Sequence, residues 1–297
     1  FYFLFPVYSV CSVGRFFLVF FYFLMKPKDL EKIETFLLLE TVFRRYGYDF
    51  RNYAPSSLKR RLNAIKTKFE LPNLSDMIPK VLHDHQFFNS FLEALSISTT
   101  EMFRDSHFFL ALRQKVFPIL RTYPYIKVWH AGCSTGEEVY SMAILLQEEG
   151  LLKRTQIYAT DFNQRSLDVA QEGIYSKKAV DQYAINYNKA GGKASMSDYF
   201  HSKYGSIKMN DFLKKKILFS FHNMVTDSSF GEMNIIVCRN VFIYFDKTLQ
   251  NRILRLFLDS LCHRGFLCLG DKESLDFNGH RESFEIFSKK EKIFRKI

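Results

Sequence analysis

The sequence predicts an α/β protein in which an all-helical N-terminal part precedes a doubly wound parallel sheet. The first observation is that apolar residues follow a helical period, without strand patterns, from residue 26 to about residue 123. The second is that short β-rich runs alternate with helical segments from residue 124 onward, which is typical of a parallel sheet covered by helices. The third is the composition, with 47% hydrophobic and 25% charged residues, which supports a packed core and excludes a largely disordered chain.

Residues 1–24 form an apolar stretch that differs from the remainder of the chain, and Arg15 is its one charged residue. Its length is enough to span a bilayer. Pro6, Gly14 and Arg15 disfavour a membrane helix, and no basic start or small-residue end marks a signal peptide. We therefore expect a non-native extension ahead of Met25, and a membrane anchor is the alternative.

A helical N-terminal domain is expected over residues 25–123. Ser56 and Ser57 are suited to cap a helix that begins at Leu58. The pattern predicts an amphipathic helix from about residue 33 to residue 46, followed by helices at residues 58–69, 73–83, 86–95 and 107–122.

A second domain is expected over residues 124–297. Residues 173–216 interrupt its alternation of strands and helices and are too long for a plain connection. We therefore expect a helical bridge and a small inserted subdomain at about residues 176–216. Strands are expected at residues 125–130, 155–160, 217–221, 233–238 and 265–269, with a closing hairpin at residues 283–288 and 292–296.

The sharpest local signal is a strand followed by the turn AGCSTGEE and a helix, over residues 131–138. Gly132 and Gly136 permit a tight turn close to a ligand, and the helix N-terminus directs amide groups to the same place. Such a turn forms the nucleotide site of an open α/β sheet. It lacks the G-K-[ST] ending of a P-loop and differs from G-x-G-x-x-G. Glu137 and Glu138 at the helix start disfavour a dinucleotide and favour a ligand with a cationic group.

Asp161 follows the second predicted strand, where an acid in such folds binds a ribose diol. The glycine turn, the acidic helix start and this acid together indicate S-adenosylmethionine, which carries a sulfonium, an ammonium group and a ribose but no phosphate. Two alternatives stay open. Glu137 and Glu138 can instead complement the helix dipole, and Asp161 can instead cap the next helix.

The chain holds five cysteines, an odd number without C-x-x-C or zinc-ligand spacing. We therefore expect a cytoplasmic protein that has no disulfide framework and no metal site. Cys133 and Cys238 are interpreted as small packing residues rather than nucleophiles.

Basic charge is concentrated in residues 51–69, which hold six basic side chains and no acid, in a chain of formal charge +11. Such a run is ordinarily a solvated helix face, and the alternative is a docking surface for an acidic partner. The spacing of Leu58, Leu62, Ile65 and Phe69 is that of a core face, and the run does not interleave aromatic and basic residues as base stacking requires. A nucleic-acid partner is therefore not expected.

Three segments of the chain, read together, resemble the CheR-type chemotaxis-receptor methyltransferases, which are S-adenosylmethionine-dependent protein-glutamate O-methyltransferases. They are TTEMFRD at residues 99–105, VWHAGCSTGEE at residues 128–138 and CRNVFIYF at residues 238–245. The resemblance extends over roughly residues 33–297. Shorter matches lie at residues 47–50, 57–62, 159–161, 173–175 and 222–224.

The resemblance implies a Rossmann-like methyltransferase domain that carries a small inserted antiparallel β-subdomain and follows the helical domain. It implies S-adenosylmethionine as the cofactor and S-adenosylhomocysteine as the product, and it places the catalytic residues Arg104 and Tyr244 beside the methyl group. Ser98 stands where relatives often carry Asn, which shortens or removes one cofactor contact. The implied cofactor-binding residues are Ser98, Thr100, Arg104, Gly132, Glu138, Asp161, Asn223, Met224, Arg239 and Asn240.

The implied reaction needs no general base, because a glutamate side chain with a pKa of about 4.3 is already ionised at neutral pH. Arg104 is expected to orient the incoming carboxylate, and Tyr244 is expected to line the methyl channel. Asn223 and the backbone near Met224 are expected to contact the adenine edge. The alternatives are a salt bridge of Arg104 with a neighbouring acid and an ordinary half-buried aromatic at Tyr244.

The expected function is methyl transfer to glutamate side chains of chemoreceptors or receptor-like signalling proteins, forming glutamyl methyl esters. The expected partners are the acidic methylation helices of the receptor, and a receptor C-terminal tail peptide is a further candidate. Membrane association is expected only through the receptor or residues 1–24. The alternatives are a non-catalytic signalling scaffold that binds S-adenosylmethionine and a methyltransferase with a non-receptor acceptor.

Overall fold

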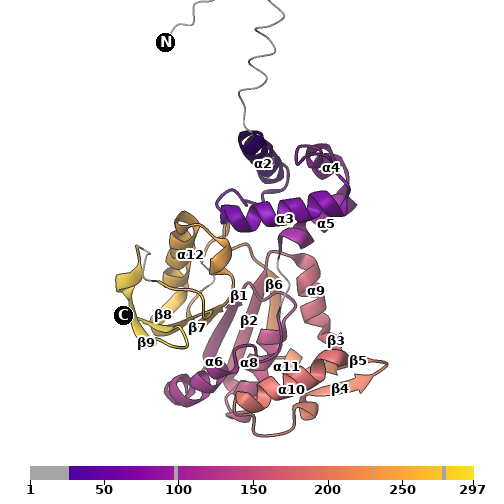
Figure 1. The fold of residues 1–297 in the computed structure, drawn as a ribbon. Helices are drawn as coiled ribbons and strands as arrows, with labels where there is room; N and C mark the ends of the chain where they lie inside the picture. The colour runs from indigo at the N-terminus through magenta and orange to yellow at the C-terminus, as the bar shows by residue number, and fades with distance from the viewer. Residues whose placement is uncertain (1–26, 97–99, 230, 276–278) are drawn as a thin grey trace, which may run out of the picture. The chain divides into compact units, whose positions relative to one another are not determined.

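The computed structural model describes residues 27–96, 100–229, 231–275 and 279–297 (Figure 1). In these residues the chain forms two compact units. The smaller unit comprises residues 27–51 and 62–88, and the larger unit comprises residues 52–61 and the described residues after 88. Residues 1–24, with their expected extension or anchor, lie outside the described residues. None of the helices in the described ranges is both long and apolar enough to cross a membrane.

The smaller unit is helical, as the sequence predicts. In α2 (Pro27–Tyr46), Leu38 and Val42 are fully buried, and in α4 (Met77–His83) so is Val81. Residues four apart lie on the same face of a helix, so α2 presents an apolar stripe to the core. The Tyr46 hydroxyl donates a hydrogen bond to the Val81 carbonyl at 2.8 Å and so ties α2 to α4.

Two helices, α3 (Pro55–Lys68) and α5 (His85–Leu95), each run from one unit into the other. Pro55 occupies the first position of α3, where its missing N–H is not needed. Leu58, Leu62 and Ile65 are buried along α3, which confirms these positions of the predicted core face.

The helix predicted over residues 107–122 is interrupted in the structure. It consists of α6 (Ser106–Ala111), the π-helical turn η1 (Leu112–Val116) and α7 (Phe117–Leu120). Pro118 explains the irregularity, because proline lacks an N–H and its ring collides with the carbonyl four residues earlier.

The domain boundary expected between residues 123 and 124 remains a prediction. In the structure, residues from 89 onward group with the sheet that follows them. Phe108 and Phe117 lie in the same hydrophobic core as Ile126 and Val128. The helical segment before the sheet is therefore part of the wall that packs against it.

Seven strands of the larger unit form one sheet in the order β6-β2-β1-β7-β8-β10-β9. The first five of these run parallel, and β10 is antiparallel to both β8 and β9. The direction of winding reverses between β1 and β7, which creates the crevice where open α/β sheets bind ligands. The predicted doubly wound sheet is confirmed. Its strands are β1 (Ile126–Ala131), β2 (Thr155–Asp161), β6 (Ile217–Phe221), β7 (Met233–Cys238), β8 (Leu261–Leu269), β9 (Phe284–Ser288) and β10 (Ile293–Lys296).

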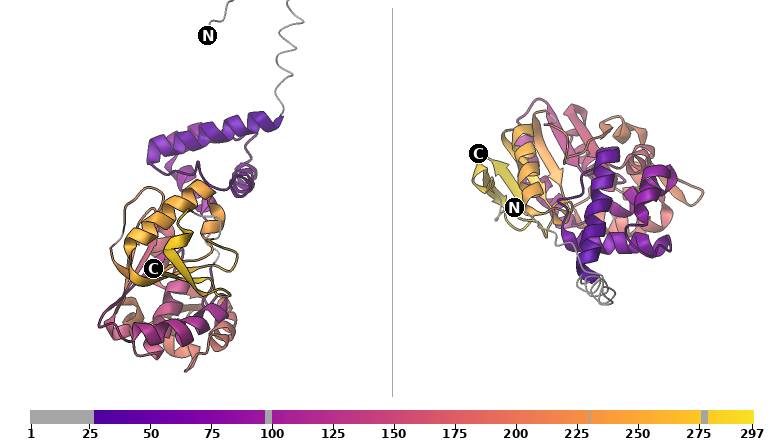
Figure 2. Two further views of the ribbon diagram at one scale, coloured as in Figure 1. Left: turned by 90° about the vertical axis from the view of Figure 1, so that its left-hand side faces the viewer. Right: turned by 90° about the horizontal axis from the view of Figure 1, so that it is seen from above.

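Helices cover both faces of this sheet. Side chains alternate along β1, so that Val128 packs in the core of α8 (Glu137–Glu148) and Trp129 packs in the core of α12 (Lys247–Ser260). The Trp129 indole N–H donates to Thr160 Oγ1 at 2.8 Å, which satisfies its one polar group. Figure 2 shows α12, in orange, beside the yellow C-terminal strands. On the other side of the switch point, β2 is followed by α9 (Gln164–Glu172).

A second sheet contains three antiparallel strands in the order β3-β5-β4. They are β3 (Ile174–Ser176), β4 (Phe200–Lys203) and β5 (Ser206–Met209), with α10 (Val180–Lys189) between β3 and β4 in the chain. This confirms the inserted antiparallel β-subdomain. The remaining short elements are η2 (Leu152–Arg154), η3 (Lys177–Ala179), η4 (Met196–Tyr199), α11 (Asp211–Lys214), η5 (Phe242–Tyr244) and η6 (Arg281–Ser283).

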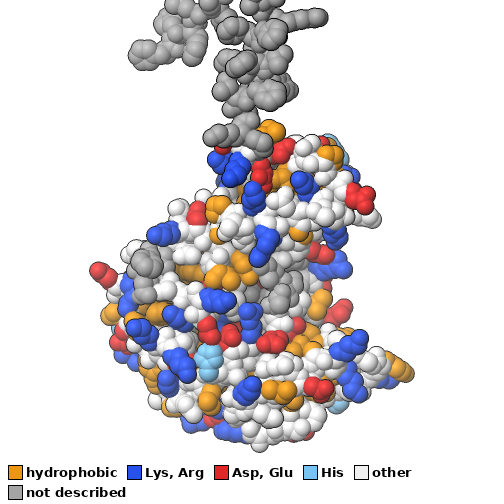
Figure 3. All heavy atoms as spheres, viewed as in Figure 1, with side chains coloured by type: hydrophobic (Ala, Val, Ile, Leu, Met, Phe, Trp, Pro, Cys, Tyr) orange, Lys and Arg blue, Asp and Glu red, His pale blue; other side chains and the backbone are white. Residues whose placement is uncertain are grey.

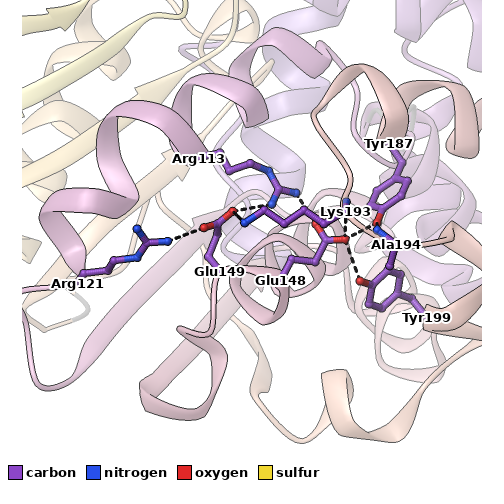
Figure 4. A network of polar contacts seen from close by, with 8 residues as sticks. All are labelled: Arg113, Arg121, Glu148, Glu149, Tyr187, Lys193, Ala194 and Tyr199. Atoms are coloured by element: carbon purple, nitrogen blue, oxygen red, sulfur yellow. Dashed lines mark hydrogen bonds and ion pairs between the residues drawn. The ribbon is translucent and has the colours of Figure 1, made fainter.

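A buried polar network joins the C-terminal end of α8 to the inserted segment (Figure 4). Glu148 accepts hydrogen bonds from the hydroxyls of Tyr187 and Tyr199 and forms an ion pair with Arg113. Arg113 also pairs with Glu149 at 2.7 Å. Burial by itself raises the pKa of Glu148, but the hydrogen bonds from Tyr187 and Arg113 outweigh burial and lower it. The carboxylate therefore stays charged and anchors the inserted segment to the main sheet.

Candidate cofactor and active site

A cavity of about 330 Å³ lies in the larger unit, at the carboxyl ends of the parallel strands. Such crevices at the switch point of an open sheet are the usual ligand sites of this architecture. The structure brings together every predicted site residue that it describes, and Ser98 lies outside the described residues. The predicted residues that line the cavity are Thr100, Arg104, Gly132, Glu138, Asp161, Asn223, Met224, Arg239, Asn240 and Tyr244.

The turn between β1 and α8 forms one wall of the cavity. Gly132 has a φ of +79°, and a Cβ there would lie 2.9 Å from Val241 Cγ2. The backbone N–H groups of Gly132 and Cys133 both donate to the Thr160 carbonyl, at 2.8 and 2.9 Å. These bonds fasten the turn to the end of β2, so its backbone is held close to the ligand space.

Asp161 ends β2 with its side chain in the cavity wall, only 8% exposed. Its Oδ2 accepts the Ser134 N–H at 2.8 Å and its Oδ1 accepts the Asn163 N–H at 2.9 Å. Burial raises the pKa of Asp161, and these backbone donors oppose the rise. The alternative role as a helix cap is wrong, because Asn163 is the residue that caps α9. Asp161 is thus a rigidly held acceptor suited to a ribose diol.

Glu138 is the member of the acidic pair that faces the cavity. One of its oxygens lies 2.8 Å from Arg239 Nη1, and the other lies 3.3 Å from His130 Nδ1. Burial by itself raises the pKa of Glu138, but Arg239 and His130 outweigh burial and lower it. A negative charge is therefore maintained at the start of α8, where it can attract a cationic ligand group.

Glu137 is buried away from the cavity and is 7% exposed. Its Oε2 accepts a hydrogen bond from the Thr135 hydroxyl at 2.7 Å. Burial raises its pKa to about 7. The two adjacent acids therefore have different roles, although the sequence treats them as one motif.

Arg239 is fully buried between two acids. Its Nη1 pairs with Glu138 at 2.8 Å and its Nη2 pairs with Asp105 at 2.7 Å, while the guanidinium lies 4.2 Å above the Phe108 ring. Both terminal nitrogens thus have acidic partners within the protein. The geometry supports a role for Arg239 in holding Glu138, in addition to lining the cavity.

Asn223 and Met224 form a further part of the cavity wall. The Asn223 side-chain oxygen accepts the Val225 N–H at 3.0 Å, and the Asn223 N–H donates to Asp227 Oδ2 at 2.8 Å. This turn is connected to the end of β2, because the His222 N–H donates to the Asp161 carbonyl at 3.2 Å.

Arg104 and Tyr244 line the same cavity, together with a residue that sequence reasoning did not assign to the site. That residue is Arg61 of α3, whose guanidinium lies 4.5 Å from the centre of the Tyr244 ring. Arg61 Nη1 donates to the Leu95 carbonyl, and its Nε and Nη2 are buried with no hydrogen-bond partner among the described residues. Burial accordingly lowers the pKa of Arg61. The basic run at residues 51–69 is the feature of the sequence that could have pointed to Arg61. The pattern does not show which arginine of the run enters the cavity.

These features together define the class of the S-adenosylmethionine-dependent methyltransferases. They are a doubly wound sheet with a glycine turn at its switch point, a buried acid after the next strand and a negative charge at the start of the helix. Residues 98–293 match the family "CheR methyltransferase, SAM binding domain", and residues 34–96 match "CheR methyltransferase, all-alpha domain". The chain therefore belongs to the CheR family of chemotaxis methyltransferases, and its cofactor is S-adenosylmethionine.

Two relatives whose names include methyltransferase agree with this assignment. The chain is 52% identical over 264 residues to "Putative methyltransferase Cher3" of Pseudomonas putida, covering 89% of this chain and 97% of that protein. It is 32% identical over 244 residues to "Chemotaxis protein methyltransferase 1" of Vibrio cholerae, covering 77% and 84%. A solved magnesium protoporphyrin IX methyltransferase from Synechocystis, with bound SAH, aligns with a TM-score of 0.33 at 15% identity, covering 67% of this chain and 73% of that one.

Proposed function

We propose that this methyltransferase transfers a methyl group to glutamate side-chain carboxylates of chemoreceptors or receptor-like signalling proteins, forming glutamyl methyl esters. The observation that carries the proposal is the gathering of Arg61, Arg104 and Tyr244 on one cavity. Two cationic side chains and a phenol suit an anionic acceptor. The name of the Vibrio cholerae relative supports a chemotaxis role.

The cofactor roles follow from the groups in the wall. Asp161 binds the ribose diol, and Glu138 attracts the cationic methionine end of S-adenosylmethionine. Asn223 and the backbone near Met224 contact the adenine edge. Thr100, Arg104, Gly132, Arg239 and Asn240 complete the binding site among the described residues.

When bound, S-adenosylmethionine supplies an electrophilic methyl group on a sulfonium. The acceptor carboxylate would form a C–O bond to this methyl group as the C–S bond breaks, the sulfonium charge and the carboxylate charge would cancel, and S-adenosylhomocysteine would be the product. No proton moves, because the acceptor is already ionised at neutral pH. Arg104 orients the carboxylate and Tyr244 lines its approach, so catalysis depends on positioning and on the exclusion of water.

The basic run is proposed to guide an acidic substrate helix to this site. Arg51 forms ion pairs with Asp49 at 2.9 Å and with Glu40 at 3.0 Å, so its charge is already balanced within the protein. Lys59 and Arg60 are exposed at the start of α3, and Arg60 also lines the cavity. Figure 3 shows Lys and Arg side chains interspersed with Asp and Glu on the face drawn, not gathered into one uniform patch. Encounter should therefore depend on salt, since complementary surface charges are screened.

The direct test is methyl transfer from radiolabelled S-adenosylmethionine to purified receptor cytoplasmic fragments. We expect label that is released as volatile methanol in base, because carboxyl methyl esters hydrolyse there whereas methylated amines do not. A fragment with its candidate glutamates changed to alanine is the matched control. Base-stable label would indicate another acceptor, and tight cofactor binding without any transfer would indicate a scaffold.

A further inference from the structure

Glu273 lies just after β8 and is only 3% exposed. Its Oε2 accepts the backbone N–H of Gly270 and, at 3.1 Å, that of Asn240. Its Oε1 accepts the Ile243 N–H at 3.3 Å. One buried carboxylate therefore binds its own turn and also the segment of residues 239–245, which is called the tyrosine loop below.

The tyrosine loop has a backbone that needs such an acceptor. It leaves the end of β7 with Asn240 at a φ of +61°, in the left-handed region that side-chain-bearing residues seldom adopt. It then forms the short turn η5 instead of continuing β7, which ends at Cys238. Residues held in strained conformations persist only where the surroundings over-determine them. The two oxygens of Glu273 supply that constraint.

The loop carries groups that the cavity uses. Asn240 and Tyr244 both line the cavity, one at each end of the segment that Glu273 holds. Tyr244 is further fixed from the other side, because its carbonyl accepts the Ala54 N–H at 2.8 Å. The direction of the phenol therefore depends on the backbone that Glu273 anchors.

The turn after β8 and the tyrosine loop are closely packed at Gly270. A Cβ added to Gly270 would lie 2.8 Å from the Asn240 nitrogen and 2.9 Å from Glu273 Oε2. Real Cβ atoms essentially never approach other heavy atoms this closely. Gly270 and Glu273 therefore act together in bringing the turn after β8 against the tyrosine loop.

We propose that Glu273 is a positioning residue for methyl transfer, whose carboxylate holds the tyrosine loop so that Asn240 and Tyr244 face the reacting groups. Glu273 is not among the described residues that line the cavity, so it acts through the loop. The proposal rests on the proposed function only for the choice of acceptor in the kinetic assay.

The test compares Glu273→Gln with Glu232→Gln, which changes an exposed acid by the same chemistry. Glutamine keeps the size of the side chain and one oxygen acceptor, but it turns an N–H donor toward backbone N–H groups. We expect kcat to fall about 10- to 100-fold, as small misplacements of reacting groups do. The affinity for S-adenosylhomocysteine, measured by calorimetry, should fall less than kcat does, because Asn240 shifts whereas Asp161 and the glycine turn remain in place.

A second measurement needs no acceptor. Hydrogen exchange at the Asn240 and Ile243 amides should be slow in the wild type and at least about tenfold faster in Glu273→Gln, with Glu232→Gln unchanged. Gly270→Ala should displace the same loop by another route and reproduce both effects, which keeps the test decisive if Glu273→Gln does not fold. The proposal would be overturned if folded Glu273→Gln or folded Gly270→Ala had the kcat of the wild type and the same exchange rates at Asn240 and Ile243. If the Asn240 and Ile243 amides exchange as expected but the wild-type protein methylates no glutamate, the proposed function is wrong and the positioning role of Glu273 is unaffected.

Discussion

Glu137 and Glu138 show at the scale of single residues how neighbours of the same type acquire different chemistry. Successive helical residues point about 100° apart, so one carboxylate faces the cavity and the other faces the core. The Arg239 guanidinium beside Glu138 keeps that carboxylate charged. Glu137 is buried, and its carboxyl group accepts a hydrogen bond from the Thr135 hydroxyl. The environment, more than the residue type, sets the charge.

Glu137 should make stability depend on pH. Burial raises its folded-state pKa from 4.5 to about 7, so the folded protein holds this proton more tightly than the unfolded chain does. The resulting stabilisation is fully present below pH 4.5 and is lost as the pH rises through about 7, a change of about 3 kcal/mol in the free energy of unfolding. Urea unfolding should show Glu137→Gln to be more stable than the wild type at pH 8. The exposed Glu282→Gln variant should keep the wild-type profile, and identical profiles for all three proteins would contradict the assignment.

Asp161→Ala should weaken binding of S-adenosylhomocysteine by about 10- to 100-fold. The change removes the proposed ribose ligand and leaves the Ser134 and Asn163 N–H groups without their acceptor. Calorimetric titration is the measurement, and Asp168→Ala on the exposed face of α9 is the control. Unchanged affinity in a folded Asp161→Ala protein would remove Asp161 from the cofactor site.

At the scale of elements, the turn between β1 and α8 depends on close contact with its neighbours as well as on its own conformation. Gly136 has a φ of +90° and precedes α8, and a Cβ there would lie 2.8 Å from Ala170 Cβ on α9. Gly205, between β4 and β5, has a φ of +74° but meets nothing within 4 Å. Both glycines have a positive φ, but only Gly136 is closely packed against a neighbouring element.

We therefore expect Gly136→Ala to destabilise the protein more than Gly205→Ala. Both changes introduce left-handed strain of about 1–2 kcal/mol, and Gly136→Ala adds an overpacking cost of about 1–3 kcal/mol. Denaturant midpoints of the two variants measure the difference directly. Equal losses would mean that α9 moves aside without cost.

At the scale of the whole molecule, the inserted segment is attached to the main sheet by polar contacts as well as by apolar packing. The Glu148 network in Figure 4 connects η1, α8, α10 and η4. Removing one partner of a buried ion pair strands the other, whereas an exposed pair contributes little.

Glu148→Ala should accordingly lower the free energy of unfolding by about 3 kcal/mol, because Arg113 and two tyrosine hydroxyls lose an acceptor. Asp259→Ala, which breaks an exposed pair with Arg255 on α12, should lower it by less than about 1 kcal/mol. Chemical unfolding of the two variants checks the contrast, and similar losses would argue against an anchoring role for Glu148.

The sequence by itself determined the order of helices and strands, the glycine turn and the class of cofactor. These depend on local periodicity and short motifs, and the switch point of a parallel sheet then brings the predicted residues together, as Gly132, Asp161 and Tyr244 show. The same local reasoning missed the π-helical turn before Pro118, where a helical period continues through a change in hydrogen bonding.

Only the tertiary structure decided which acid of a pair is charged, which arginine of a basic run reaches the cavity and which distant carboxylate supports the tyrosine loop. Arg61 lines the cavity from α3, and Glu273 supports the tyrosine loop from the turn after β8, and both roles follow from burial and partners. Burial and pairing arise between elements that are remote in the chain. A one-dimensional pattern records which groups are present, whereas the folded core determines the electrostatic environment of each one.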